Sequence, residues 1–325
     1  MIRFTFRKKV FIEFLLLSTV CIIISIFIAN RDQYLPDYQM YLTLYNYSSD
    51  LVEVSFNTIA TFFRTYFNDG FVFFLFFYAL LGFVLHMFFA YFYVKNEQGW
   101  IRYLIYLIPY FFYFFIFWDL IQIRYSAGIS FLLFGIFSAS NKWRIVFFSL
   151  AIFFHNSMLL PEALFILYST LKKDYLKFLS IPIITAVAYI GLQFTRYSSK
   201  YEQSSAEWDH LNLLGGNCLI LYLLVASLFY FKSFINLKYK NQITALIFTT
   251  SVLAMLIVVL NTDYPAIANR LLALTLFLAF TCVSFVKNKY NLIYFLLVSI
   301  VFSAWNFNII ILDPKSFFNT LWYHY

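Results

Sequence analysis

The chain has 325 residues, of which 63% are hydrophobic, 24% are aromatic and only 12% are charged. A soluble domain carries about 25% charged residues, so this composition excludes an ordinary soluble protein and indicates a polytopic membrane protein. The net charge of +8 does not indicate nucleic-acid binding, because the lysines and arginines occupy short segments between apolar runs. We therefore expect one all-α membrane domain over residues 1–325, with about nine to eleven transmembrane helices.

The first apolar run, residues 10–29, is long enough to cross a hydrocarbon core about 30 Å thick. Basic residues precede it, so we expect a cytosolic amino terminus and a retained first helix. Residues 30–70 would then be external, and their tyrosines recur at helical spacing, which predicts helices on the membrane surface. Asp32, Asp37 and Arg64 in this loop are candidate substrate-binding residues. The alternative is that the tyrosines only anchor the loop at the interface.

The next three predicted spans are 71–94, 103–118 and 119–139. The last of them contains Arg124, and an arginine inside a membrane costs several kcal/mol unless it meets a partner, a ligand or water. Gly128 and Gly135 lie on the same helix face as Arg124, so a neighbouring helix or lipid chain can approach closely there. A packing seam explains the glycines but not the arginine.

Residues 145–171 are long for one span and short of the roughly 40 residues that two spans need. If the segment turns back, eight lysines fall in later cytosolic loops: Lys172, Lys173, Lys177, Lys232, Lys238, Lys240, Lys287 and Lys289. If it crosses once, these loops contain four basic residues: Arg196, Lys200, Arg270 and Lys315. The lysines favour a re-entrant hairpin with its apex at 155–157, although a single span stays open.

Five more spans are predicted at 178–194, 217–231, 243–260, 271–286 and 291–312, which gives nine full spans and an external carboxyl terminus. External loops at 195–216 and 261–270 contain Arg196 and Arg270, two further candidate substrate-binding residues. The mixed charge of the first of these loops also fits a plain solvated face. Cys21, Cys218 and Cys282 fall in apolar segments without metal-ligand spacing, so we expect buried thiols and no metal.

Chain geometry places Arg124 and His155 at one depth. If Asn141–Arg144 form the turn of a helical hairpin, Arg124 precedes this turn by 17 residues and His155 follows it by 14. At about 1.5 Å per residue, both lie roughly 21 to 25 Å from the turn. With the turn in the cytosol, that level is in the outer part of the membrane.

A resemblance rests on these same residues. Gln122-x-Arg124-x-x-Ala127-Gly128 ahead of an apolar helix, a Lys/Arg break, and then Phe154-His155-x-Ser157 resembles the Wzy-type polysaccharide polymerases of the EpsG family. The resemblance implies a glycosyltransferase of the bacterial inner membrane that acts in O-antigen or exopolysaccharide synthesis. It would join undecaprenyl-diphosphate-linked oligosaccharides at the outer face, without a cofactor. The lipid bilayer, a chain-length regulator and a flippase are the implied partners, and nucleic acid is not.

Candidate roles follow from this chemistry. The planar guanidinium of Arg124 suits phosphate oxygens, and Gln122 lies beside it as a further substrate-binding candidate. The unperturbed pKa of a histidine side chain suits a general base, which makes His155 a candidate, and Asp119, Asp32 or Asp37 could serve instead. Two structural alternatives stay open: His155 could bind backbone carbonyls at the helix break, and Arg124 could pair with Asp119.

Two other functional classes fit the sequence less well. A transporter or flippase for lipid-linked glycans needs charged residues along a full pathway, whereas the predicted intramembrane charges cluster towards one side, apart from Glu13. A membrane O-acyltransferase also uses a histidine near such a site, but its early Arg and His pattern is not found in the first span. The polymerase is the hypothesis that the sequence favours.

Overall fold

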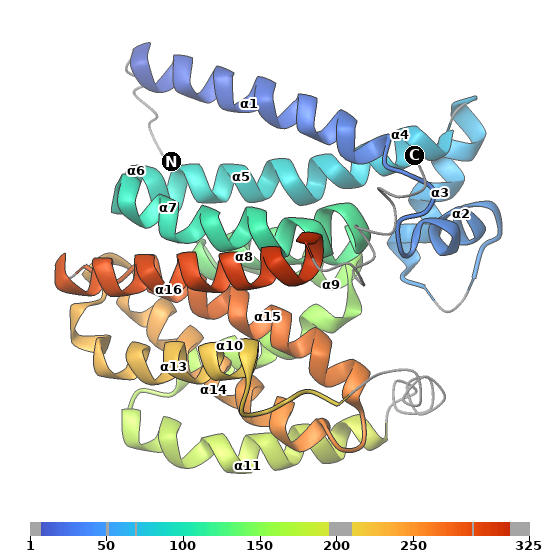
Figure 1. Cartoon of the computed structure of the whole chain (residues 1–325). Coiled ribbons are helices and arrows are strands. Elements are labelled where there is room, and N and C mark those ends of the chain that lie inside the picture. Colours follow the sequence, from blue (N-terminus) through green and yellow to red (C-terminus); the bar gives the residue numbers. More distant parts are fainter. Residues whose placement is uncertain (1–7, 50–51, 69, 195–209, 288, 313–325) are drawn as a thin grey trace. The chain divides into compact units, whose positions relative to one another are not determined.

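The computed structural model describes residues 8–49, 52–68, 70–194, 210–287 and 289–312 (Figure 1). The regular elements in these residues are helices, and seven of them are long and apolar enough to cross a membrane. Two shorter apolar helices, Ile123–Phe137 and Gly216–Tyr230, accompany them. The predicted all-α polytopic fold is therefore confirmed.

The chain forms two compact units, which we describe separately. The first consists of residues 1–91 and 115–158, and the second of residues 92–114 and 159–325. The single membrane domain expected over residues 1–325 stays a prediction.

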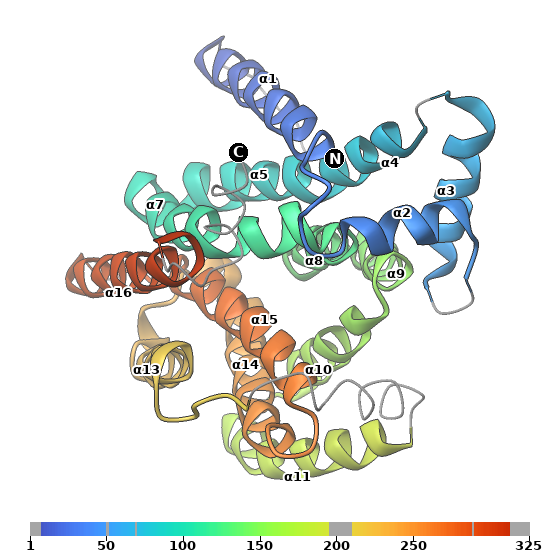
Figure 2. The ribbon, with the colours of Figure 1, turned by 45° about the vertical axis from the view of Figure 1, so that its right-hand side comes forward.

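The first unit begins with α1 (Lys8–Ala29), whose many exposed aliphatic side chains suit a lipid environment. Its other elements in chain order are α2 (Tyr38–Asn46), α3 (Val54–Tyr66), α4 (Gly70–Ala79), η1 (Leu80–Val84), α5 (Leu85–Phe89), the first residues of η2 (Ala90–Lys95), the end of η3 (Tyr110–Ile121), α8 (Ile123–Phe137), α9 (Asn141–Phe154) and η4 (Asn156–Met158). Helices α2 and α3 confirm that residues 30–70 contain helices, and their location on the membrane surface stays a prediction (Figure 2). Helix α3 packs on α4 through the rings of Phe56 and Phe74, whose centroids lie 4.9 Å apart.

Helices α8 and α9 pack along each other, and the glycines of α8 make this possible. A Cβ atom at Gly135 would overlap the ring of Phe148, and one at Gly128 would lie 3.0 Å from the Cβ atom of His155. The close approach predicted at this face is thus confirmed. The predicted turn at Asn141–Arg144 is wrong, because residues 138–140 form the turn and α9 already begins at Asn141.

The predicted span at 119–139 is divided by Gln122. Its backbone (φ −99°, ψ 61°) is not helical, so Asp119 lies near the end of the π-helix η3, which ends at Ile121, and Arg124 lies in the first turn of α8, which begins at Ile123. The amide of Gln122 donates to the carbonyl of Phe117 at 2.9 Å, an i to i−5 bond typical of a π-helix. Asp119 and Arg124 therefore lie on separate helices, whereas the sequence predicted one continuous span over residues 119–139.

The second unit is built around α14. In chain order it contains the remainder of η2, α6 (Asn96–Gln98), α7 (Trp100–Pro109), the start of η3, α10 (Leu159–Thr170), α11 (Asp174–Gln193), α13 (Gly216–Tyr230), η6 (Lys232–Phe234), η7 (Leu237–Tyr239), α14 (Lys240–Leu260), α15 (Pro265–Val283), α16 (Lys289–Phe307) and η8 (Asn308–Leu312). Helix α14 is mostly buried and packs against α10, α11, α13 and α15. Aromatic rings of three helices surround Phe248: Tyr168, Phe178 and Phe229, with centroids 5.0 to 5.4 Å away.

The three turns that carry the predicted cytosolic lysines and the turn that contains Glu97 are joined at one end of the second unit. The Asn236 amide donates to the side-chain carbonyl of Gln98 at 3.0 Å, and the Lys238 ammonium contacts the carboxylate of Glu97 at 2.6 Å. In the same way Arg102 donates to the carbonyl of Val286, and Lys232 pairs with Asp174. The turns thus lie on a common side, which agrees with the lysine count.

The break predicted at residues 155–157 is present, because α9 ends at Phe154 and α10 begins at Leu159. Reversal of the chain at this break stays a prediction. The predicted external turn at 261–270 is shorter than expected, because α15 already begins at Pro265 and includes Arg270. Proline suits the first helical turn, where its missing N–H group is not needed.

Labelling of single cysteines with a membrane-impermeant maleimide tests the orientation. The native thiols Cys21, Cys218 and Cys282 are buried, so the background should be low. We expect Lys173→Cys and Lys240→Cys to react only after permeabilisation and Asp263→Cys to react in intact cells, because lysine-rich turns stay in the cytosol. Labelling of Lys173→Cys in intact cells would contradict the hairpin.

Candidate functional site

Arg124, in the first turn of α8, forms a buried ion pair with Glu53. Its Nη1 atom donates to Oε2 of Glu53, and both side chains are largely shielded from solvent. The guanidinium carbon also lies 5.6 Å from the ring centroid of Tyr41 and 5.4 Å from that of Phe56. Glu53 directly precedes α3, so a surface helix of the first loop supplies the partner that the buried arginine requires.

The charge state of Glu53 follows from this contact. Burial by itself would raise the pKa of its carboxyl, but Arg124, His155 and backbone hydrogen bonds together outweigh burial, so the pKa lies below its ordinary value. Glu53 is therefore ionised at neutral pH. The Nε atom of Arg124 is buried and has no hydrogen-bond partner among the described residues, so the pair does not use the whole guanidinium.

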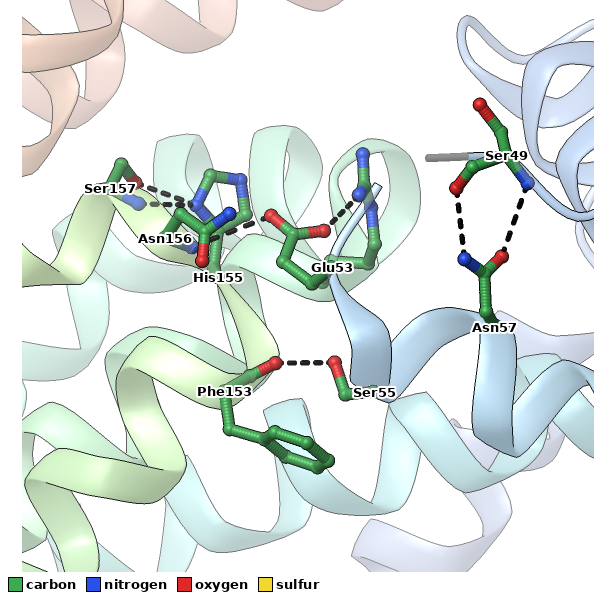
Figure 3. Close-up of polar contacts among 9 residues, drawn as sticks. Ser49, Glu53, Ser55, Asn57, Phe153, His155, Asn156 and Ser157 are labelled. Atoms are coloured by element: carbon green, nitrogen blue, oxygen red, sulfur yellow. Dashed lines mark hydrogen bonds and ion pairs between the residues drawn. The ribbon is translucent and has the colours of Figure 1, made fainter. Parts of the chain in front are cut away.

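Glu53 also reaches the helix break after α9 (Figure 3). Its Oε1 atom accepts a hydrogen bond from the backbone amide of Asn156, with an N–O distance of 3.4 Å. Two residues further on, the Ser55 hydroxyl donates to the carbonyl of Phe153. The start of α3 thereby contacts two helices of the site. It binds the first turn of α8 through Arg124 and the end of α9 through the backbone.

His155 occupies the break itself, with an extended backbone (φ −155°, ψ 114°) that ends α9. Its ring lies edge-on to Tyr125, the residue after Arg124, with centroids 5.0 Å apart. The Nδ1 atom lies 2.7 Å from Oγ of Ser157 and accepts from the Ser157 amide at 3.3 Å. A neutral imidazole that accepts at Nδ1 carries its proton on Nε2, so Ser157 sets the tautomer. The expected shared level of Arg124 and His155 is confirmed by these contacts.

Asp119 makes a different contact from the one considered in the sequence. Its Oδ1 atom accepts from the Ser126 hydroxyl at 2.6 Å, and both residues are buried. A side chain at Gly82 would collide with Ser126, so this close packing requires glycine. The structural pairing of Arg124 with Asp119 is therefore wrong, because Gln122 separates their helices and Glu53 takes the place of Asp119.

The other candidates of the first unit lie in the loop and its helices. Asp32 accepts from the amide of Tyr34 at 2.9 Å and shapes the turn after α1. Asp37 precedes α2 in a left-handed conformation (φ 66°), and Gln122 is half-buried beside Arg124. Their roles in substrate binding stay predictions.

Arg64 lies in α3 at an open hollow of about 360 Å³, which Tyr45 and Phe71 also line. Its Nη1 atom donates to the carbonyl of Asn46 at 2.6 Å, so part of the guanidinium is engaged by the backbone. Arg270 is exposed on α15 in the second unit, and Arg196 lies outside the described residues. The structure thus brings Arg124, His155, Asp119 and Arg64 into one unit, whereas Arg270 belongs to the other unit.

Sequence reasoning missed two residues of this region, Glu53 and Arg31. Glu53 is one of several acids in residues 30–70, and only its position before the apolar face of α3 distinguishes it. Arg31 follows the first span and reads as an ordinary flanking cation, yet only 7% of its surface is exposed. Neither has a local signal of burial, because their neighbours come from distant segments.

Comparison with known proteins gives one match. A family model described as the EpsG family matches residues 14–325, nearly the whole chain. No curated protein and no solved structure matches.

The ion pair allows a test that separates folding from function. Glu53→Leu leaves a buried, unpaired arginine and should lower stability by roughly 3 to 5 kcal/mol, whereas Glu53→Leu combined with Arg124→Met should recover most of the loss. Purified membrane protein of each variant would be compared by its thermal midpoint and its abundance.

The matched control is the exposed pair of Glu97 and Lys238, in which Glu97→Leu should change stability by only about 1 kcal/mol or less. Equal stability of wild type and Glu53→Leu would show that the contact does not hold α3 to α8. Failure of the double variant to recover would show that Glu53 acts through Asn156 instead.

Proposed function

Because the chain belongs to the EpsG family, we propose that it is a polysaccharide polymerase that joins undecaprenyl-diphosphate-linked oligosaccharide repeat units at the outer face of the bacterial inner membrane. The family supports polysaccharide biosynthesis, and the helices support a membrane protein. The main support for a diphosphate substrate is the buried Arg124. One of its donors is paired with Glu53, and its Nε atom has no hydrogen-bond partner among the described residues. Such a donor suits a phosphate oxygen.

The reaction is a glycosyl transfer. The acceptor sugar hydroxyl attacks the anomeric carbon of the donor, and the bond from that carbon to the diphosphate oxygen breaks. The leaving undecaprenyl diphosphate keeps the electron pair, and Arg124 stabilises its charge without a metal. Glu53 is a positioning residue, because its ion pair with Arg124 holds the guanidinium in place.

The proton of the acceptor hydroxyl needs a base, for which we propose His155. Because Ser157 occupies Nδ1, the proton would pass through the Ser157 hydroxyl, which donates its own hydrogen to Nδ1 as it accepts one from the sugar. Asp119 is a weaker candidate, since its Oδ1 atom already accepts from Ser126 in a buried setting. The imidazole therefore remains the preferred base.

Arg124→Lys tests the binding role. Lysine keeps the charge and can still pair with Glu53, so abundance should stay near normal, but the planar fork is lost. We expect binding of undecaprenyl diphosphate to fall about 10- to 100-fold, and polymer formation with it, which is the range for a lost charged hydrogen bond. Full-length polymer from Arg124→Lys would refute the binding role.

His155→Gln and Ser157→Ala test the proton transfer with purified enzyme and lipid-linked repeat units. Both variants should bind donor normally while turnover falls, by about 10² to 10⁴ for His155→Gln. His210→Gln, which alters a histidine of the second unit that contacts the carbonyl of Asn261, is the control and should retain turnover. Normal turnover of His155→Gln would leave His155 as support for the helix break.

A further inference from the structure

Arg31 is a second buried arginine in the first unit, and its hydrogen bonds are incomplete. It follows the end of α1, and its Nη1 atom donates to the carbonyl of Leu120 at 2.6 Å. Its Nε and Nη2 atoms are buried and have no hydrogen-bond partner among the described residues. Only 7% of the residue surface is exposed, so bulk water does not readily replace the missing partners.

The two unpaired atoms form one edge of the guanidinium. Nη1 lies on the same side as Cδ, so the N–H bonds of Nε and Nη2 point in parallel away from it. This edge binds carboxylate or phosphate groups through two parallel hydrogen bonds. The bond to Leu120 fixes the orientation of the group and leaves this edge available. A purely structural role for Arg31 explains Nη1 but not the other two atoms.

The surroundings of Arg31 connect it with Arg124. Both guanidinium carbons lie within 6 Å of the ring centroid of Tyr41, at 5.9 Å for Arg31 and 5.6 Å for Arg124. The carboxylates of Asp37 and Asp119 are near enough to favour the charged form. Burial lowers the pKa of Arg31 to about 10, so the group is a cation at neutral pH.

We propose that the Nε and Nη2 edge of Arg31 binds one phosphate of the lipid-linked diphosphate whose other phosphate contacts Arg124. This inference rests on the proposed function and adds a residue to its substrate site. Two buried cations on one tyrosine ring match a ligand with two adjacent phosphate groups. The guanidiniums then share the charge that develops on the leaving diphosphate.

The test uses the purified full-length protein in nanodiscs, with undecaprenyl diphosphate as the probe. Arg31→Lys removes the fork and Arg31→Met removes the charge, and we expect affinity to fall about tenfold and about a hundredfold. The matched control is Arg102→Lys, because Arg102 donates through Nε and Nη1 to the carbonyls of Val286 and Gln98. It should bind within about twofold of wild type.

Thermal midpoints separate binding from folding. A ligand site predicts that both Arg31 variants keep midpoints within a few degrees of wild type, because the unpaired edge contributes little to the unliganded fold. Loss of folded protein in both variants would assign Arg31 to the fold and overturn the proposal. An equal loss of affinity in the Arg102→Lys control would also overturn it.

Two further arms separate this inference from the proposed function. If Arg124→Lys weakens binding and the Arg31 variants do not, the Arg31 site is wrong and the proposed function stands. If the wild type binds undecaprenyl diphosphate but forms no polymer from lipid-linked repeats, the proposed function fails alone. Competition by inorganic pyrophosphate, but not by phosphatidylglycerol, is expected. Equal competition by phosphatidylglycerol would assign the edge to general lipid phosphate and overturn the proposal.

Discussion

The buried pair of Arg124 and Glu53 is the interaction on which the candidate site depends. A guanidinium taken out of water requires a compensating charge, and here that charge comes from a residue 71 positions earlier in the chain. Glu53 meets this requirement and at the same time binds the amide of Asn156. One carboxylate thereby holds a surface helix, the first turn of α8 and the break after α9 in a single arrangement.

The backbone around this pair is irregular where the chemistry is concentrated. Gln122 interrupts the apolar run so that Asp119 and Arg124 lie on separate helices with separate partners. At the break after α9, Ser157 contacts Nδ1 of His155 and so determines which ring nitrogen accepts a proton. Gly128 lets the backbone carrying His155 approach α8 closely enough for these contacts to form. Irregular backbone at membrane depth needs such protein partners, since lipid supplies none.

The incomplete hydrogen bonding of the arginines is also informative. Protein interiors pair nearly all buried polar groups, so unpaired charged donors lower the stability of the fold. Nε of Arg124 and the Nε and Nη2 edge of Arg31 occur within one small region around Tyr41. A local loss of stability of this kind is typical of a binding site whose hydrogen-bond donors are paired only when the ligand is bound. Arg64 differs in this respect, because the carbonyl of Asn46 engages its guanidinium.

The sequence by itself determined the helical membrane fold, the presence of helices within residues 30–70, the glycine face of α8 and the helix break at His155. These features depend on local composition and periodicity, which a short window of sequence contains. The sequence also indicated that Arg124 needs a partner, but it did not identify which residue that partner is. Only the tertiary structure selected Glu53, separated Asp119 from Arg124 and buried Arg31. Ion pairing and burial are decided by segments far apart in the chain, so acids and arginines that look alike in sequence receive different surroundings only when the helices pack.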